Sequence, residues 1–174
     1  NMITVSRLKE LKKEHPGAIV VAYIKSPAAV KAEADICVAT ENAARIIEKL
    51  PANKEIIFVP DQYMGSYVTA QTGRDMILWP GYCNTHLRIQ PRDIHRLKTQ
   101  YPNAKVVIHP ECRPEVIALA DAVLSTSGML RFVGKSDAAD FIIGTEIGIL
   151  HRLRKENPDK RFFAASDDAV CHRM

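Results

Sequence analysis

The sequence predicts an α/β protein made of two homologous three-layer αβα domains with parallel sheets. Short runs rich in Val and Ile alternate with helical segments along the whole chain. These runs, such as Ala18–Ile24 and Asp140–Ile143, do not alternate apolar with polar residues, as expected of parallel strands covered on both faces. The chain also repeats itself, and 174 residues that are 47% hydrophobic can form a real core.

The repeat appears when the sequence is shifted by 86 positions. Residues 15–40 then align without a gap with residues 101–126. The identical pairs are Pro16/Pro102, Ala18/Ala104, Val20/Val106, Val21/Val107, Val30/Val116, Ala32/Ala118, Ala34/Ala120, Asp35/Asp121 and Thr40/Thr126. We therefore expect one domain over residues 1–86 and a second over residues 87–174, with Thr85–Arg92 as the link.

Each repeat begins with a helix that ends before a proline, because the residue before proline is pushed out of the helical region. In the first repeat the expected elements are, in order, helix Val5–Glu14, strand Ala18–Ile24, a helix around Val30, strand Ile36–Ala39, helix Asn42–Leu50, strand Glu55–Val59, helix Tyr63–Thr72 and strand Met76–Trp79. Segments Pro51–Lys54 and Pro80–Pro91 read as loops.

The second repeat follows the same order of elements. We expect helix Arg92–Gln100, strand Ala104–His109, a helix around Val116, strand Ala122–Leu124, helix Ser127–Val133, strand Asp140–Ile143, helix Glu146–Asn157 and strand Arg161–Phe163. Strands alternating with helices in this way indicate parallel sheets.

Composition excludes several classes of protein. No apolar stretch approaches the roughly 20 residues of a membrane span, and no signal-peptide pattern opens the chain, so we expect a cytoplasmic protein without membrane contact. The net charge of +4 comes from scattered Lys and Arg with nearby acidic partners, such as Lys9 with Glu10. Nucleic-acid binding is therefore not expected, whereas a small anionic substrate suits the charge.

Polar side chains occur where a structural strand would place Val or Ile. Parallel sheets bind ligands beyond the carboxyl ends of their strands. Candidate ligand-binding residues at these ends are Tyr23, Lys25 and Thr40 in the first repeat, and His109, Glu111, Ser125 and Thr126 in the second. A His and a Glu together can transfer protons near neutral pH, and a Ser-Thr pair opening a helix suits a carboxylate or phosphate.

Each of these candidates also has a structural interpretation. Ser125, Thr126 and Thr40 can be ordinary helix caps. His109 and Glu111 can belong to a solvated loop, Tyr23 can be a strand aromatic, and Lys25 can be a solvated charge. Both interpretations stay open on the residues alone.

The four cysteines are too few and too widely spaced for a disulfide framework. Cys83 and Cys171 each follow the last strand of their repeat and are equivalent, whereas Cys37 reads as a buried strand thiol. Cys112 is either a helix N-terminal thiol with a lowered pKa or a residue without function.

Two kinds of metal site are compatible with these thiols. Cys83, His86 and Cys171 could contribute to a zinc site, although the usual zinc-module spacings are missing. Two thiolates are too few for an iron–sulfur cluster. A preceding copy of the repeat would place a third cysteine just ahead of Asn1, and three units around a pseudo-threefold axis would then hold a cluster.

Several motifs resemble the quinolinate synthase (quinolinate synthetase A) family. They are VAYIKSPAAVKAEADICVAT, FVPDQYMGSYVTAQTG, WPGYCNTH, VVIHPEC, LSTSGM, FIIGTEIGILHRL, NPDKRFF and the closing CHRM. The resemblance covers essentially the whole chain. It implies domains two and three of a triangular enzyme that has three αβα domains around a 4Fe–4S cluster. It also implies condensation of iminoaspartate with dihydroxyacetone phosphate to quinolinate, in NAD biosynthesis.

The resemblance also implies roles for single residues. Cys83 and Cys171 match two cluster ligands, and the third is expected upstream of Asn1. Residues that match substrate contacts are Tyr23, Thr40, His109, Glu111, Ser125 and Thr126; of these, His109, Glu111 and Tyr23 are the catalytic candidates. Lys25 stands where the family usually has asparagine, and Thr40 where it often has serine. A lysine can still pair with a substrate carboxylate, but the acceptor of asparagine is lost.

The family resemblance implies that these 174 residues alone do not turn over, because one ligand and the first domain are missing. It also implies a functional link to an aspartate oxidase or aspartate dehydrogenase. Two rival functions remain: a non-catalytic α/β module that binds a small carboxylate or phosphate ester, and a zinc-binding protein.

Overall fold

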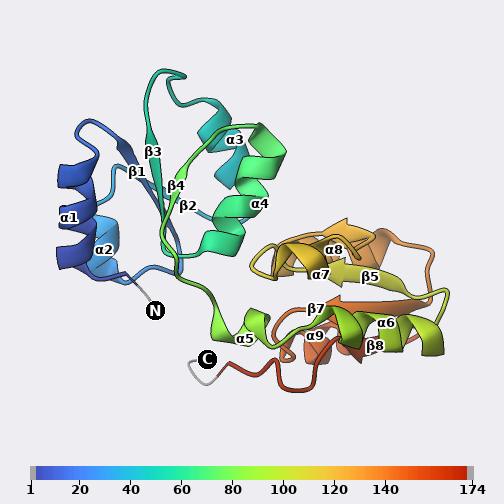
Figure 1. The fold of residues 1–174 in the computed structure, drawn as a ribbon. Coiled ribbons are helices and arrows are strands. Elements are labelled where there is room, and N and C mark those ends of the chain that lie inside the picture. The colour runs from blue at the N-terminus through green and yellow to red at the C-terminus, as the bar shows by residue number, and fades with distance from the viewer. Residues whose placement is uncertain (1–2, 172–174) are drawn as a thin grey trace. The chain divides into compact units, whose positions relative to one another are not determined.

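The computed structural model describes residues 3–171 and divides the chain into two compact units, Asn1–Tyr82 and Cys83–Met174 (Figure 1). This division lies ahead of the linker expected at Thr85–Arg92, at the end of the WPGY segment.

The first unit contains four strands and four helices in strict alternation along the described chain. They are α1 Val5–Glu14, β1 Ile19–Tyr23, α2 Ala28–Ala32, β2 Ile36–Val38, α3 Ala43–Glu48, β3 Ile56–Val59, α4 Gln62–Thr72 and β4 Ile77–Leu78.

The second unit repeats this order and adds one short helix at its start. Its elements are α5 Asn84–Leu87, α6 Pro91–Gln100, β5 Lys105–Ile108, α7 Pro114–Ile117, β6 Ala122–Val123, α8 Thr126–Lys135, β7 Asp140–Gly144, α9 Ile149–Glu156 and β8 Arg161–Ala164. Helix α5 was missed in the segment expected to be a loop, because four residues are too few to show helical periodicity.

Both sheets have four parallel strands and the same topology. The strand order is β2-β1-β3-β4 in the first unit and β6-β5-β7-β8 in the second. The registers also correspond, since Ala22 lies beside Val59 and Ile108 beside Gly144. The expected fold class, two α/β units with parallel sheets, is confirmed. Its triangular, pseudo-threefold arrangement stays a prediction.

Each sheet is covered on both faces, which explains the uninterrupted apolar strands. In the first unit Val21 and Phe58 pack into one cluster with α3 and α4, whereas Val20 and Ile57 pack into another with α1 and α2. The second unit has the same three layers: Val106 and Ile142 face α6 and α7, and Val107 and Phe141 face α8 and α9.

The helices that precede the central strands end at equivalent residues. His15 and Tyr101 have φ/ψ of −124°/72° and −130°/73°, and their N–H groups donate to Leu11 and Leu97 carbonyls. Each precedes a proline, which forces this non-helical conformation. The two repeats therefore use the same signal to end α1 and α6.

One expectation about the cysteines was wrong: Cys37 is exposed rather than buried. Its neighbours Ile36 and Val38 pack into the core on one face of β2. Cys37 points to the opposite face, and β2 is the edge strand of its sheet, where the helical layer provides less cover. Among residues 3–171, no helix has both the length and the apolar character that a membrane crossing requires.

Candidate functional site

Several buried polar side chains of the second unit lie at the carboxyl ends of β5 and β7. The N–H of His109 donates to the Gly144 carbonyl at 2.9 Å, so the two strands stay paired up to this point. A Cβ on Gly144 would collide with Cδ1 of Ile108. The glycine therefore leaves room for the buried side chain of Ile108, its neighbour on β5.

The HPEC segment folds into a tight turn after β5. The N–H of Cys112 donates to the His109 carbonyl at 3.0 Å, and the N–H of Glu111 donates to Nδ1 of His109 at 3.3 Å. His109 and Glu111 are each only 2% exposed. The solvated-loop interpretation of these two residues therefore does not describe their surroundings.

Helix α5 places a second histidine against the first. His86 is 3% exposed, and its ring stacks on that of His109 with the centroids 4.6 Å apart and the planes at 24°. Its Nε2 forms a hydrogen bond with Oγ1 of Thr145, which directly follows β7, at 3.0 Å. The two imidazoles are thus held by three different segments of the unit.

Glu111 lies between the two histidines. Its Oε2 is 3.2 Å from Nδ1 of His109 and 3.7 Å from Nδ1 of His86. A buried carboxylate is costly unless it is paired, and two neighbouring imidazoles can stabilise it by carrying a proton. The thiol of Cys83, at the start of α5, also belongs to this group: the donor atoms of Cys83, His86 and Glu111 all lie within 4.8 Å of one another.

The four cysteines fall into different environments. Cys112 is fully buried, and its Sγ lies 3.6 Å from the Gly144 carbonyl. Cys83 and Cys171 are partly exposed. The segments that carry them are adjacent, since Thr85 contacts the Val170 carbonyl at 3.5 Å and Arg88 the Asp168 carbonyl at 3.3 Å. The thiol of Cys112 is therefore a core group, whereas the residues Cys83 and Cys171 are each partly exposed.

Ser125 and Thr126 follow β6 at the same edge of the sheet. Ser125 is the N-cap of α8, and its Oγ accepts a hydrogen bond from the N–H of Gly128 at 2.9 Å. Thr126 begins the helix and is exposed. Ser125 therefore caps α8. The exposed Thr126 and the N-terminus of α8 lie next to this cap.

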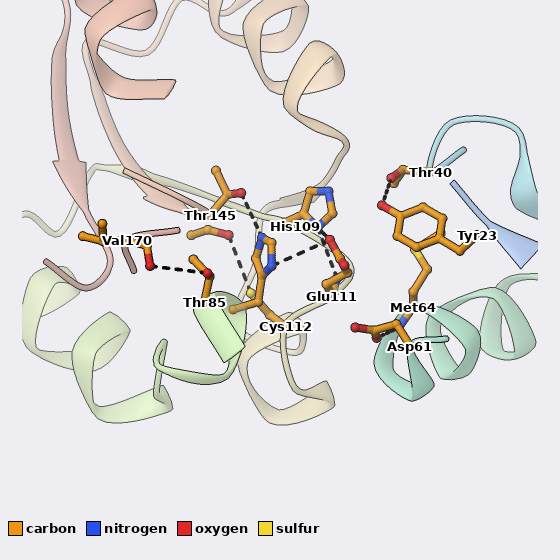
Figure 2. A network of polar contacts seen from close by, with 12 residues as sticks. Tyr23, Thr40, Asp61, Met64, Thr85, His109, Glu111, Cys112, Thr145 and Val170 are labelled. Carbon is orange, nitrogen blue, oxygen red and sulfur yellow. Dashed lines mark hydrogen bonds and ion pairs between the residues drawn. The ribbon is translucent and has the colours of Figure 1, made fainter. Parts of the chain in front are cut away.

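In the first unit Tyr23 and Thr40 form a pair at the equivalent strand ends. Tyr23 is the last residue of β1 and is 1% exposed, and its hydroxyl lies 2.8 Å from Oγ1 of Thr40 (Figure 2). Lys25 is exposed, with its Nζ 5.7 Å from the centre of the Tyr23 ring. The three candidates of this unit therefore lie together.

Among the described residues, sequence reasoning missed the buried polar residues Ser26, Asp61, Thr85 and Thr145 as candidates. Thr145 contacts His86, and Asp61 caps α4 by accepting from the N–H of Met64 at 2.9 Å. Asp61 is 3% exposed and directly follows β3 and a proline, so the strand-end rule could have found it. His172, which follows Cys171 in the sequence, lies outside the described residues.

Comparisons with known proteins agree with the motif resemblance. The pattern of the family described as quinolinate synthetase A protein matches residues 1–174. Proteins named quinolinate synthase from Dehalococcoides mccartyi (strain CBDB1) and Geotalea uraniireducens (strain Rf4) are each 52% identical over 174 residues, which is all of this chain and 57% of theirs. Quinolinate synthase 2 of Methanosarcina acetivorans is 45% identical over the whole chain and 56% of its own length. The chain thus spans little more than half the length of these relatives, and it belongs to the quinolinate synthetase A family.

Proposed function

We propose that this chain supplies two domains of a quinolinate synthase, which condenses iminoaspartate with dihydroxyacetone phosphate and dehydrates the product to quinolinate. The observation that carries the proposal is the buried His109–Glu111 pair beside the partly exposed thiol of Cys83. A buried acid–base pair at a strand end is what proton abstraction and loss of water require. The name of the relatives, quinolinate synthase, supports quinolinate as the product.

The residues present fit part of a 4Fe–4S site. Such clusters are bound by cysteine thiolates, and Cys83 and Cys171 are partly exposed on adjacent segments. Cys112 does not fit, because its thiol is fully buried in the core. We infer that Cys83 and Cys171 are two ligands and that a third cysteine comes from the part of the protein outside these 174 residues.

When bound, a cluster with one iron that lacks a cysteine ligand supplies a Lewis acid for a substrate oxygen. The chain itself would supply the proton transfers. Oε2 of Glu111 lies within 3.7 Å of both imidazoles, so a proton taken by one of these groups can be passed to another. The burial of Glu111 and His109 keeps bulk water from competing for that proton.

Tyr23, Lys25 and Thr40 would bind the substrate from the first unit. The hydrogen bond with Thr40 orients the phenol of Tyr23, which can then act as a proton donor, and the exposed ammonium of Lys25 can pair with a carboxylate or phosphate. Thr126 and the N-terminus of α8 offer a second position for an anion. Two dianionic substrates need several such positions.

The supply of iminoaspartate constrains the partners. It is an unstable imine formed by oxidation of aspartate, so we propose an aspartate oxidase or dehydrogenase as the enzyme that feeds this reaction.

The test requires a complete enzyme. In the completed chain, those parts of the Dehalococcoides mccartyi relative that lie outside its match to these 174 residues are fused to them in their native order. We expect the completed chain, reconstituted anaerobically with iron and sulfide, to form quinolinate, whereas the 174 residues alone form none. The product is measured by chromatography against a quinolinate standard.

Two results would contradict the proposal. Quinolinate from the 174 residues alone, with their mass verified, would show that the missing part is not needed. A completed chain that holds iron and sulfide, binds a carboxylate or phosphate ester, and still forms no product would favour the non-catalytic module.

A further inference from the structure

Cys83, His86 and Glu111 form a donor set that can be used without an iron–sulfur cluster. Their donor atoms lie within 4.8 Å of one another, and Nδ1 of His86 is 3.7 Å from Oε2 of Glu111. Around a tetrahedral zinc ion, with bonds of about 2.0–2.3 Å, donor atoms are separated by about 3.3–3.8 Å. One edge of such a tetrahedron is therefore already present. The separations that involve Sγ of Cys83 are at most 4.8 Å and need to shorten by at most about 1–1.5 Å.

The surroundings of His86 match those of a metal-bound histidine. A histidine ligand usually donates the N–H of its other ring nitrogen to an oxygen, which fixes the ring and its tautomer. Oγ1 of Thr145 lies 3.0 Å from Nε2 of His86 and can accept this hydrogen bond. The lone pair of Nδ1 then points toward the Glu111 carboxylate, and a cation between the two atoms would stabilise both.

The electrostatics of Glu111 favour the same conclusion. Its buried carboxylate faces Nδ1 of His109 as well as Nδ1 of His86, and Nδ1 of His109 already accepts from the N–H of Glu111. Two acceptor nitrogens beside a carboxylate repel it unless a proton or a metal ion lies among them. The thiolate of Cys83 adds a soft donor on the same side.

We propose that the second unit binds one divalent transition-metal ion, with zinc preferred, through Cys83, His86 and Glu111 when no cluster is present. One thiolate, one imidazole and one carboxylate suit zinc, and three protein ligands leave a fourth position for water. The site differs from the zinc alternative drawn from the sequence, which used Cys171 in place of Glu111. Cys83 cannot serve zinc and a cluster together, so zinc would exclude the cluster; only this consequence rests on the proposed function.

Cobalt and zinc titrations of the 174-residue chain test the site. The chain is freed of metal with a chelator under reducing conditions and titrated with Co²⁺, whose visible spectrum reports tetrahedral geometry and whose near-ultraviolet band reports a thiolate ligand. Zn²⁺ is then added to displace the cobalt. We expect one ion per chain, with a thiolate–cobalt band that is absent in Cys83→Ala.

Further variants separate this donor set from its rivals. His86→Gln and Glu111→Gln should each lower the zinc affinity by at least about tenfold, and Thr145→Val by about 10–100-fold, because second-shell changes alone have effects of that size. Cys37→Ser, which removes the exposed thiol of the other unit, is the control and should bind zinc as the wild type does. Cys171→Ser should also retain the affinity.

Three results would overturn the proposal: a thiolate–cobalt band that persists in Cys83→Ala, loss of the site in Cys171→Ser, or unchanged affinity in Glu111→Gln. Circular dichroism checks that each variant is folded. If His86→Gln unfolds, Cys83→Ala and Thr145→Val decide the matter. Since neither iron nor substrate is present, a failed quinolinate assay leaves this result unaffected.

Discussion

The two units of the chain have the same arrangement of strands and helices, and they differ in the side chains at the carboxyl ends of their strands. In each, an aspartate that is identical in the repeat holds the first central strand: Oδ2 of Asp35 accepts from the N–H of Val20, and Oδ2 of Asp121 from the N–H of Val106, both at 2.8 Å. The strand orders also match. The bonds that build the sheet have therefore been kept in both copies.

The strand ends have changed. The first unit ends β1 with Tyr23, bonded to Thr40, whereas the second ends β5 with a turn that buries His109 and Glu111 against His86. Two copies of one arrangement thus offer a phenol in one unit and a carboxylate between imidazoles in the other. The chemistry of this fold is therefore determined by a few residues at the carboxyl ends of the strands.

The largest expected effect comes from Glu111. In the completed chain, Glu111→Gln should lower kcat about 10²–10⁴-fold, because the amide keeps the shape but cannot carry a proton. Rates of quinolinate formation at saturating substrate measure this. Glu115→Gln makes the same change on an exposed residue nearby and should keep the wild-type rate. A kcat for Glu111→Gln within threefold of the wild-type value would contradict the proton-transfer role that we propose for Glu111 in the second unit.

The next largest effect concerns two paired residues on neighbouring strands. The larger residue of the pair lies on β3 in the first unit but on β5 in the second. Ala22 lies beside Val59 in the first sheet, and Ile108 beside Gly144 in the second. Gly144→Ala should lower the free energy of unfolding by about 1–3 kcal/mol, because the new Cβ meets the buried Ile108 side chain. Urea denaturation of the 174-residue chain measures it.

A second variant sharpens this test. Gly144→Val combined with Ile108→Ala copies the pair of the first unit and should be more stable than Gly144→Val alone. If the double variant is instead the less stable one, the two sheets do not pack in the same way at this position.

The contribution of Asp121 to the free energy of unfolding should depend on pH. Burial alone would raise the pKa of Asp121, but the hydrogen bond from the Val106 N–H and the ammonium of Lys105 outweigh it, and the pKa is lowered. A lowered pKa in the folded state stabilises the fold above the unfolded value, near about 3.9, and this contribution is lost as the pH falls through the folded value.

Because Asp121 is exposed and solvent screens its ion pair, Asp121→Asn should cost no more than about 1 kcal/mol of stability at pH 7, and the difference from wild type should shrink below about pH 4. Unfolding measured at pH 7 and pH 3 checks this. A difference that is the same at both pH values would show that the charge of Asp121 does not contribute.

The smallest expected effect is that of the hydrogen bond at the edge of the first unit. Thr40→Val should lower the free energy of unfolding by about 0.5 kcal/mol, the low end for a hydrogen bond, because the bond with Tyr23 is only partly buried. Thr40→Ser keeps the hydroxyl and should behave as the wild type in the same denaturation experiment. Equal losses in both variants would mean that the methyl group matters rather than the bond with Tyr23.

The arrangement of strands and helices was predictable from the sequence because its signals are local and occur twice. Prolines after His15 and Tyr101 and unbroken apolar strands such as β3 indicate the element order in each copy. The strand-end rule also predicted His109, Glu111 and Tyr23 as candidates, and the structure places them, buried, at the ends of β5 and β1.

The rest depends on contacts between distant segments. Nothing local shows that His86, in a four-residue helix, stacks on His109 and contacts Thr145, which is 59 residues away. The exposure of Cys37 likewise depends on β2 lying at the edge of its sheet. Neither the contacts of His86 nor the exposure of Cys37 can be predicted from the periodicity of the sequence.

The central claim is that Cys83 of the second unit, beside the His86–Glu111 group, is a ligand of the cluster on which the reaction depends. The most direct measurement is the iron and sulfide content of the anaerobically reconstituted completed chain, together with its charge-transfer absorbance. We predict about four irons in the wild type and in Cys112→Ser, and loss of iron and colour in Cys83→Ser. A brown Cys83→Ser protein with its full iron content would contradict the account.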